Sequence, residues 1–453
     1  MSSRRQFIRE SVMATGGLLL ANSSYANIFI GRKPVVIIIG AGFAGLSAAT
    51  FLKKKNIDFI ILESRNRISG RVFSHTIDEA EKLVVELGAE WVGNSHSRVQ
   101  NMCNEYGLAL DNNQFNTHLI YKDRYYRNKE WNYSDEWNSK FRAIIDHYPS
   151  LSVADKKLID QTDWWRYLVN NGCAGRDLDI RELLDSTDFG ESIRSVSAFA
   201  ALAEYAESSE KNEMDLKIRG GNSQLAYKMA GQVGMDKIQL EHRVERIVQV
   251  SKGGVKVYCS NGREFTGDKI ICTAPAFAVG RIKWEPGLPA VQVQALQQLQ
   301  YARINKNPLL FRERFWKDED FDLITDQTPH YFYHATKNQP SSRGALISYT
   351  IGEKAALVAN QTDEWKKEMI SQTLSPHFGE IKSLLEKQTN YYWGNDEISR
   401  GAYAIYGRGQ WFGIQPLLKK SHIHTHFAGE HLADWQGFME GAINTGEAAA
   451  SFI

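Results

Sequence analysis

Three glycines, Gly40, Gly42 and Gly45, stand in a G-x-G-x-x-G pattern that can bind phosphate. In such a turn the first glycine makes the bend, the second lets backbone approach a pyrophosphate, and the third lets the helix pack on the strand. N–H groups at the start of the following helix then bind the phosphates. Glu63 follows about 20 residues later, where an acidic side chain can accept hydrogen bonds from ribose hydroxyls. These residues predict a site for a dinucleotide cofactor.

The flanking residues predict the strand, turn and helix that this site needs. Residues 35–39 form a continuous apolar run, residues 46–52 have a helical pattern, and residues 59–62 are a second apolar run that ends at Glu63. This βαβ unit predicts a Rossmann-like α/β domain with a buried parallel sheet. Further strands are expected at 244–250, 255–259 and 269–272, and an Ala-rich helix at the C-terminus.

The residues after Glu63 indicate which dinucleotide binds. Segment 64–72, SRNRISGRV, resembles the signature of the flavin-containing amine oxidase family, which includes monoamine oxidases and L-amino-acid oxidases. The resemblance implies an FAD cofactor, with Arg71 beside its diphosphate. Ser69 stands where the family usually has a glycine, so the sequence leaves the local backbone conformation open.

The resemblance continues along most of the chain. Segment 86–93, ELGAEWVG, resembles the family segment beneath the flavin, and segments 220–225, 240–244, 427–430 and 435–442 resemble further family motifs. The resemblance implies that Glu430 hydrogen-bonds the ribitol and that the Met439 N–H faces the flavin pyrimidine. The residues that it assigns to cofactor binding are Gly40, Gly42, Ala44, Gly45, Glu63, Ser64, Arg65, Gly70, Arg71, Val72, Gly88, Ala89, Glu90, Trp91, Val244, Trp393, Gly429, Glu430, Gly437, Phe438 and Met439.

Three residues are candidates for the catalytic step. Lys306 lies nine residues before Phe315, the spacing of the family lysine that holds a water at flavin N5 and assists reaction with oxygen. Desolvation would lower the pKa of such a lysine; an exposed lysine is the alternative. Tyr403 and Phe438 match the aromatic pair that flanks the substrate amine in monoamine oxidases, although aromatic residues of this kind also pack protein cores. Ala402 stands where those enzymes carry a flavin-linked cysteine, which implies non-covalent FAD.

The resemblance implies hydride transfer from the amine α-carbon to flavin N5, followed by reoxidation by oxygen to give hydrogen peroxide. Trp91 occupies the position where L-amino-acid oxidases carry an arginine that binds the substrate carboxylate, so we expect a monoamine with an apolar or aromatic tail. Three alternatives stay open. They are an L-amino-acid oxidase that uses Arg219 or Arg303 instead, an amine dehydrogenase that passes electrons to a periplasmic carrier, and a flavin-binding protein without turnover.

A chain of 453 residues is longer than one typical domain. We expect an α/β FAD-binding domain interleaved with a mixed α+β substrate domain. The expected FAD-binding parts are 27–101, 220–280 and 394–453, and the expected substrate-domain parts are 102–219, mostly helical, and 281–393.

The N-terminal segment 1–26 is predicted to be an export signal. Arg4 and Arg5 precede a short apolar stretch and a small-residue cleavage site near Ala26, a pattern that resembles a twin-arginine signal and predicts a periplasmic enzyme. Because the apolar stretch is about ten residues, well under the roughly 20 that span a bilayer, we expect no membrane span in the mature chain.

Charge and composition limit the partners. Lys and Arg (54) nearly balance Asp and Glu (53), which gives no reason to expect a nucleic acid and favours a small-molecule substrate. The family resemblance adds oxygen as the second reactant. The oligomeric state is open, and a homodimer is compatible with the sequence. Alternation of His422, His424 and His426 along an apparent strand could place three ligands together, but no further ligand joins them, so we predict no metal site. Four irregularly spaced cysteines match no metal pattern and are expected to be buried thiols; an oxidising destination permits a disulfide as the alternative.

Overall fold

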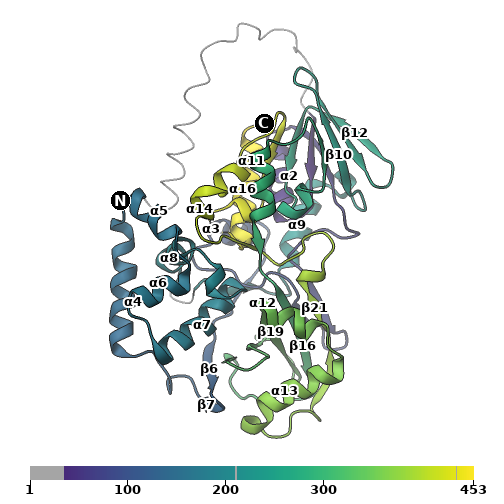
Figure 1. Cartoon of the computed structure of the whole chain (residues 1–453). Helices are drawn as coiled ribbons and strands as arrows, with labels where there is room; N and C mark the ends of the chain where they lie inside the picture. Colours follow the sequence, from purple (N-terminus) through teal and green to yellow (C-terminus); the bar gives the residue numbers. More distant parts are fainter. Residues whose placement is uncertain (1–34, 210–211, 435) are drawn as a thin grey trace.

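The structure is a computed structural model that describes residues 35–209, 212–434 and 436–453. The expected export signal therefore lies outside the described residues. The chain forms a dinucleotide-type region at the top of Figure 1 and a second region of mixed sheet and helices below it, and it passes between them several times.

A five-stranded parallel sheet forms the centre of the first region, in the order β23-β13-β1-β2-β9. All residues of β1 after Val35 are buried, as expected for an apolar run covered on both faces. The α/β prediction is thereby confirmed. The strands are β1 (Val35–Ile39), β2 (Asp58–Leu62), β9 (Ile238–Gln239), β13 (Lys269–Cys272) and β23 (Thr425–Phe427).

Helices α2 (Phe43–Lys54) and α16 (Met439–Ser451) pack against each other although they come from opposite ends of the sequence. A Cβ atom added to Gly446 would lie 2.1 Å from the Ala44 carbonyl oxygen, so the two backbones are in direct contact. Ser47 Oγ donates to the Ile443 carbonyl across the same contact at 3.1 Å. The contact fixes the start of α16 relative to the glycine turn.

Two more helices and a second sheet complete this region. The helices are α3 (Ser97–Glu105) and α9 (Ser223–Val233). The sheet, in the order β12-β11-β10-β14, contains β10 (Val244–Gln249), β11 (Val255–Cys259), β12 (Glu264–Gly267) and β14 (Lys283–Glu285).

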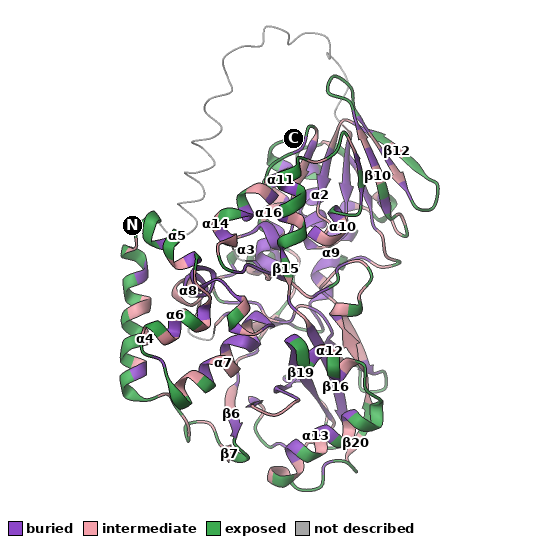
Figure 2. Ribbon diagram, viewed as in Figure 1, coloured by how far each residue is buried: buried purple, intermediate pink, exposed green. Residues whose placement is uncertain are grey.

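The second region contains a larger sheet in the order β20-β16-β19-β18-β17-β6-β7, with β21 also paired to β16. Every residue of β16 and β19 is buried, and Figure 2 shows these two strands at the centre of the region. The elements are β6 (Asn116–Tyr121), β7 (Arg124–Tyr126), β16 (Ile304–Phe311), β17 (Phe321–Thr325), β18 (Tyr331–His334), β19 (Gly344–Ile351), β20 (Leu385–Gln388), β21 (Tyr391–Tyr392), α12 (Gly352–Ala359) and α13 (Asp363–Phe378).

A group of helices stands beside this sheet, on the left of Figure 1. Its members are α4 (Asp135–His147), α5 (Val153–Asp160), α6 (Trp164–Asn170), α7 (Gly175–Phe189) and α8 (Ala198–Glu207). The helical pattern of 102–219 indicated these helices but not β6 and β7. Strand β6 pairs in parallel with β17, about 200 residues later, and such a distant partner leaves little local signal.

Short elements connect the two regions. The pair β5–β8 joins the two ends of the helical segment. A bridge between Leu216 and Val92 places residue 217 beside segment 86–93. The short elements are β3 (Ser74–Asp78), β4 (Leu83–Glu86), β5 (Leu110–Asn112), β8 (Leu216–Ile218), β15 (Gln300–Tyr301), β22 (Ala404–Ile405), α10 (Ala276–Val279), α11 (Ala290–Gln298), α14 (Gln410–Gly413) and α15 (Gln415–Leu418).

The three alternating histidines do not share one strand. His422 forms a bridge with Thr425 across a turn in which Ile423 has a φ of 54°, and β23 begins only at Thr425. His422 and His424 contact the carbonyls of Pro286 and Val250, whereas His426 contacts Ser421. Within the described residues, no group of three or more potential ligands could hold a metal ion.

Candidate functional site

A cavity of about 610 Å³ is lined by residues of both regions. Every residue that the sequence assigned to cofactor binding or catalysis, apart from Gly45, belongs to its wall. Gly45 lies beneath the glycine turn, where an added Cβ would be 1.9 Å from the Gly40 carbonyl oxygen. A side chain at this position would therefore displace the turn, which is the packing role expected of the third glycine.

The glycine turn and Glu63 form one end of the cavity. Gly40 has a φ of 104°, a conformation that favours glycine. Helix α2 begins directly afterwards. Its N-cap Gly42 provides no side-chain cap, and Gly42, Phe43 and Ala44 line the cavity, so the first turn of the helix forms part of the wall. Glu63 Oε2 accepts from the Ala41 N–H at 2.7 Å, and Oε1 accepts from the Arg65 N–H at 2.8 Å. The carboxylate is thus fixed beside a helix N-terminus that attracts anions.

Ser69 adopts the conformation of the glycine that it replaces. Its φ is 79°, its N–H donates to the Ala41 carbonyl at 2.9 Å, and its side chain is buried. Gly70 follows with a φ of 59°, and an added Cβ there would lie 3.3 Å from Gly42 Cα. The turn therefore keeps its path despite the serine, at the cost of a strained residue.

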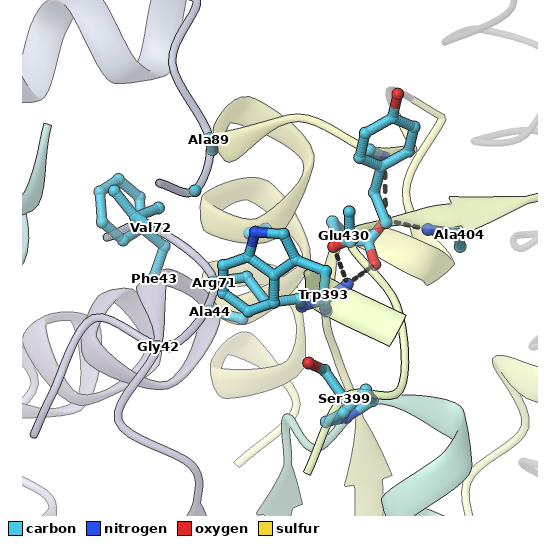
Figure 3. A pocket seen from close by; sticks show the side chains of 18 of the residues that line it. Gly42, Phe43, Ala44, Arg71, Val72, Ala89, Trp393, Ser399, Ala404 and Glu430 are labelled. Atoms are coloured by element: carbon cyan, nitrogen blue, oxygen red, sulfur yellow. Dashed lines mark hydrogen bonds and ion pairs between the residues drawn. The ribbon is translucent and has the colours of Figure 1, made fainter. Parts of the chain in front are cut away.

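Glu430, which is buried, forms an ion pair with the partly buried Arg71 in the cavity wall (Figure 3). Glu430 Oε1 accepts from the Arg71 guanidinium, and Oε2 accepts from the N–H groups of Gly437 at 2.8 Å and Ala404 at 3.3 Å. Burial by itself would raise the pKa of the Glu430 carboxyl, but the Arg71 guanidinium holds it below its ordinary value. Both carboxylate oxygens are therefore engaged as acceptors.

Helix α16 begins at the same place. Its N-cap Phe438 provides no side-chain cap, and both Phe438 and Met439 line the cavity. The Phe438 ring packs on His96 with a centroid separation of 4.9 Å. Tyr403 lies beside Gly437, and its hydroxyl donates to the Asp188 carbonyl at 2.9 Å. The two expected aromatic residues are therefore held in the wall by neighbours on different elements.

Lys306, in β16, is buried in the cavity wall with its three possible hydrogen-bond donors all engaged. Nζ lies 3.1 Å from the Glu86 carbonyl, 2.9 Å from the Gly88 carbonyl and 3.1 Å from Glu90 Oε2. Burial lowers the pKa of the Lys306 ammonium group, although the Glu90 carboxylate acts in the opposite direction. The structure therefore excludes the alternative of an exposed lysine.

Glu90 connects Lys306 to a second buried lysine that the sequence did not indicate. Glu90 Oε1 accepts from Lys217 Nζ at 2.8 Å, and Oε2 accepts from the Tyr333 hydroxyl. Burial would raise the pKa of the Glu90 carboxyl, but Lys217 and Lys306 hold it below its ordinary value. Lys217 lies in the short strand β8, where no motif or period distinguishes it.

The part of the cavity wall that comes from α7, α8 and the loops near them is here called the helical wall. Two of its residues, Asp188 and Glu204, are acidic. Burial raises the pKa of the Asp188 carboxyl to about 7, and the Tyr205 hydroxyl donates to that carboxyl at 2.7 Å. Sequence reasoning missed this wall because the segment carries no motif. Its residues are Thr187, Asp188, Phe189, Val196, Ala200, Glu204, Asn212 and Met214.

Neither arginine considered as an alternative carboxylate clamp lines the cavity. Arg219 pairs with Asp111 and Arg303 pairs with Glu191, both by short contacts outside the lining. The arginines that do line it are Arg65, Arg71, Arg243 and Arg281. In the described part of the chain, the helical wall contains no arginine, lysine or histidine.

Cys103, Cys173, Cys259 and Cys272 are buried free thiols, and burial raises the pKa of each. Among the residues that the structure describes, no helix is both long and apolar enough to cross a membrane.

Comparison with known proteins places this site in a family. The family model described as flavin containing amine oxidoreductase matches residues 43–453. An L-amino acid dehydrogenase of Synechocystis sp. is 25% identical, over 92% of this chain and 94% of that protein. Flavin-containing amine oxidase B of Homo sapiens is 22% identical, over 93% of this chain and 86% of that protein.

Solved structures have the same fold. Cyclohexylamine oxidase from Brevibacterium oxydans has a TM-score of 0.82 at 20% identity, covering 93% of this chain and 98% of that one. Wild-type putrescine oxidase bound to putrescine has a TM-score of 0.81 at 22% identity, covering 93% and 99%. The family match begins at the first residue of α2 and includes Lys306 and helix α16. The chain therefore belongs to the flavin-containing amine oxidoreductases.

Proposed function

We propose that the protein binds FAD without a covalent bond and oxidises primary amines that carry no carboxylate, with oxygen as the electron acceptor. The observation that carries the substrate proposal is the composition of the helical wall, which presents Asp188 and Glu204 but, among the described residues, no cationic side chain.

The residues present fit FAD. Two uncapped helix N-termini, those of α2 and α16, face the same cavity, and each favours negative charge. The α2 end with Glu63 suits a diphosphate and a ribose, and the α16 end suits the pyrimidine side of the flavin, where negative charge grows on reduction. Ala402 in the wall offers no thiol for a flavin bond, which supports non-covalent binding.

The helical wall disfavours a carboxylate. A carboxylate that enters an apolar and acidic wall loses its hydration and gains no cationic partner. An ionised carboxylate in this wall also repels it, as like charges do. Because burial raises the pKa of Asp188 to about 7, this repulsion grows as pH rises through neutrality. A plain amine avoids both costs, so we expect it to be preferred over the corresponding amino acid by a factor of about ten or more, or about 1.4 kcal/mol in the transition state.

Tyr403 and Phe438 would orient the amine. The Tyr403 hydroxyl remains protonated because burial raises its pKa well above the ordinary value, and its bond to the Asp188 carbonyl fixes the ring. Aromatic faces on the wall restrict the approach of the substrate and exclude water. When bound, FAD accepts a hydride equivalent from the amine α-carbon, and oxygen takes up the electrons as hydrogen peroxide. The imine product then adds water to give an aldehyde and ammonia.

The test has two stages on one protein sample. An amine such as tyramine is added without oxygen, and bleaching of the flavin absorbance is followed; oxygen is then admitted. The proposal expects bleaching by the amine and rapid recovery in oxygen. A flavin that no amine bleaches would support a binding protein without turnover, and bleaching followed by slow recovery would support a dehydrogenase.

A second candidate is oxidation of L-amino acids, favoured by the similarity to the L-amino acid dehydrogenase of Synechocystis sp.. It requires a cation for the substrate carboxylate. Faster bleaching by tyrosine than by tyramine would select it.

We further propose that the protein is exported to the periplasm by a twin-arginine signal. Arg4 and Arg5 support this proposal. The route carries folded proteins, which suits an enzyme that takes up FAD before export.

A further inference from the structure

Lys306 and Lys217 share a single carboxylate. Glu90 accepts from Lys217 through Oε1 at 2.8 Å and from Lys306 through Oε2 at 3.1 Å, and its side chain is 1% exposed. Lys306 lines the cavity, whereas Lys217 does not. Lys217 can therefore act on a molecule in the cavity only through Glu90 and its neighbours.

The contacts of Lys306 require an ammonium ion. A neutral amine has two N–H donors and a lone pair, but Nζ faces three acceptors, the carbonyls of Glu86 and Gly88 and the Glu90 carboxylate. Three aromatic rings also surround Nζ, those of Trp91, Tyr333 and Tyr349, at 5.4, 5.7 and 5.8 Å from their centroids. Aromatic faces attract cations, so these rings add to the preference for the charged form.

We propose that Glu90 is the positioning residue that keeps Lys306 charged in the cavity wall, and that Lys217 limits this effect from the opposite side of the same carboxylate. With Glu90 ionised, two ammonium groups face one carboxylate, and the cluster keeps a net positive charge beside the cavity. The hydrogen bonds and ring contacts of Lys306 imply the charge of this cluster. The effect of that charge on the reaction of reduced flavin with oxygen rests on the proposed function.

The other ionisable groups near Lys306 do not balance this charge. Burial raises the pKa of the Glu86 carboxyl, which favours its neutral form, and burial also raises the pKa of the nearby phenols. The ionisable side chains that surround Lys306 are Glu86 in β4, Glu90 just after it, Lys217 in β8, Tyr333 in β18, Tyr349 in β19 and Tyr391, opposite Lys306 in β21.

A cation at this position would act in the oxygen half of the reaction. Oxygen takes two electrons and one proton from reduced, anionic FAD and a second proton from solvent, which gives hydrogen peroxide and oxidised FAD. Negative charge grows on oxygen as the electrons transfer, and a fixed ammonium group in a desolvated wall stabilises it. The rate should therefore fall as pH rises and Lys306 loses its proton.

Two substitutions should shift this fall in opposite directions. Glu90→Gln removes the anion and keeps the shape of the side chain. The pH at which the rate of reoxidation falls should therefore drop by about one to three units. Lys217→Met removes a like charge, so the rate should fall only at a higher pH. Lys306→Met should abolish this pH dependence of the rate. Lys366→Met is a matched control, because Lys366 is equally buried but lies on α13 and pairs with Asp363.

The experiment uses the FAD-loaded protein reduced by light, without any amine, and mixes it with oxygen over a range of pH. A second measurement, the reduction potential of FAD against pH, needs no turnover. Lys306 in Glu90→Gln should take up a proton on reduction. The slope should therefore approach two protons per two electrons just above the pH at which Lys306 of the variant loses its proton in the oxidised protein, against one in the wild type at the same pH.

The two measurements separate the proposals. If the wild-type reduced flavin reacts slowly with oxygen at every pH, the oxidase proposal fails, and the potential slopes still test the role of Glu90. Identical slopes and transitions in wild type and Glu90→Gln would overturn the inference. So would shifts in the same direction for Glu90→Gln and Lys217→Met, which would indicate a structural role alone. If Glu90→Gln does not fold, Lys217→Met alone tests the inference. In that case the inference is overturned if the pH at which flavin reoxidation slows is unchanged or lower in Lys217→Met than in the wild type.

Discussion

The ion pair between Arg71 and Glu430 offers a quantitative test of how the cavity is held together. In Glu430→Gln the side chain keeps its shape but has one acceptor oxygen and an NH₂ group that can only donate. The native carboxylate uses both oxygens as acceptors, one for Arg71 and the other for the N–H groups of Gly437 and Ala404. The amide NH₂ must therefore face either a guanidinium or two N–H groups, and either arrangement leaves buried donors unsatisfied.

Breaking a buried pair by removing one partner costs about 3–5 kcal/mol, because the remaining charge is left buried. Arg71 is only partly buried, so the low end of this range applies. We expect Glu430→Gln to lower the free energy of unfolding by about 3 kcal/mol at neutral pH, measured by urea denaturation of the FAD-loaded protein. Asp58→Asn is the matched control. Asp58 pairs with Lys237 at 2.8 Å on the surface, and this pair should contribute less than about 1 kcal/mol.

The contribution of Glu430 to the free energy of unfolding should depend on pH in a definite direction. The pKa of Glu430 is lower in the folded protein than its ordinary value of 4.5, so its stabilising contribution is complete above about pH 4.5 and is lost as pH falls through the folded value. The difference between wild type and Glu430→Gln should be constant near neutrality and shrink in acid. A loss no larger than that of Asp58→Asn, or a difference that grows in acid, would refute the reasoning.

Three further predictions concern the cofactor, the oxygen reaction and export. FAD should be released intact on acid or heat denaturation, since Ala402 offers no thiol; flavin that stays with the precipitated protein would show a covalent bond. Lys306→Met should slow flavin reoxidation about a hundredfold while slowing reduction by an amine far less, because it removes a charge worth roughly 3 kcal/mol at short range; equal slowing of both half-reactions in stopped flow would place Lys306 in substrate binding. Changing Arg4 and Arg5 together to lysine should leave a folded, yellow precursor in the cytoplasm, and unchanged periplasmic protein after fractionation would contradict the signal assignment.

Local patterns in the sequence predicted the parts of the fold that short segments determine. The apolar run before Gly40, the glycine spacing and the position of Glu63 define a βαβ unit, and the structure contains it with the expected strand and helix. Lys306 was found through its spacing to Phe315, and its burial follows from the fully buried strand β16.

Other parts depend on contacts between distant segments. Lys217 meets Glu90 because β8 pairs with β5 across the helical segment, and Asp188 reaches the cavity because α7 ends beside it. No periodicity marks either residue. The histidines at 422, 424 and 426 show the opposite case, in which a pattern is present but the predicted element is not. Their alternation suggested a strand, whereas the chain makes a turn at Ile423.

The central claim is that the site accepts amines without a carboxylate, and one comparison tests it most directly. The measurement is kcat/KM for tryptamine and for tryptophan with the same preparation of FAD-loaded protein, so that the two substrates differ by the carboxylate alone. We predict a value at least tenfold higher for tryptamine, about 1.4 kcal/mol in the transition state. A higher value for tryptophan would contradict it, and would mean that a cation outside the helical wall binds the carboxylate.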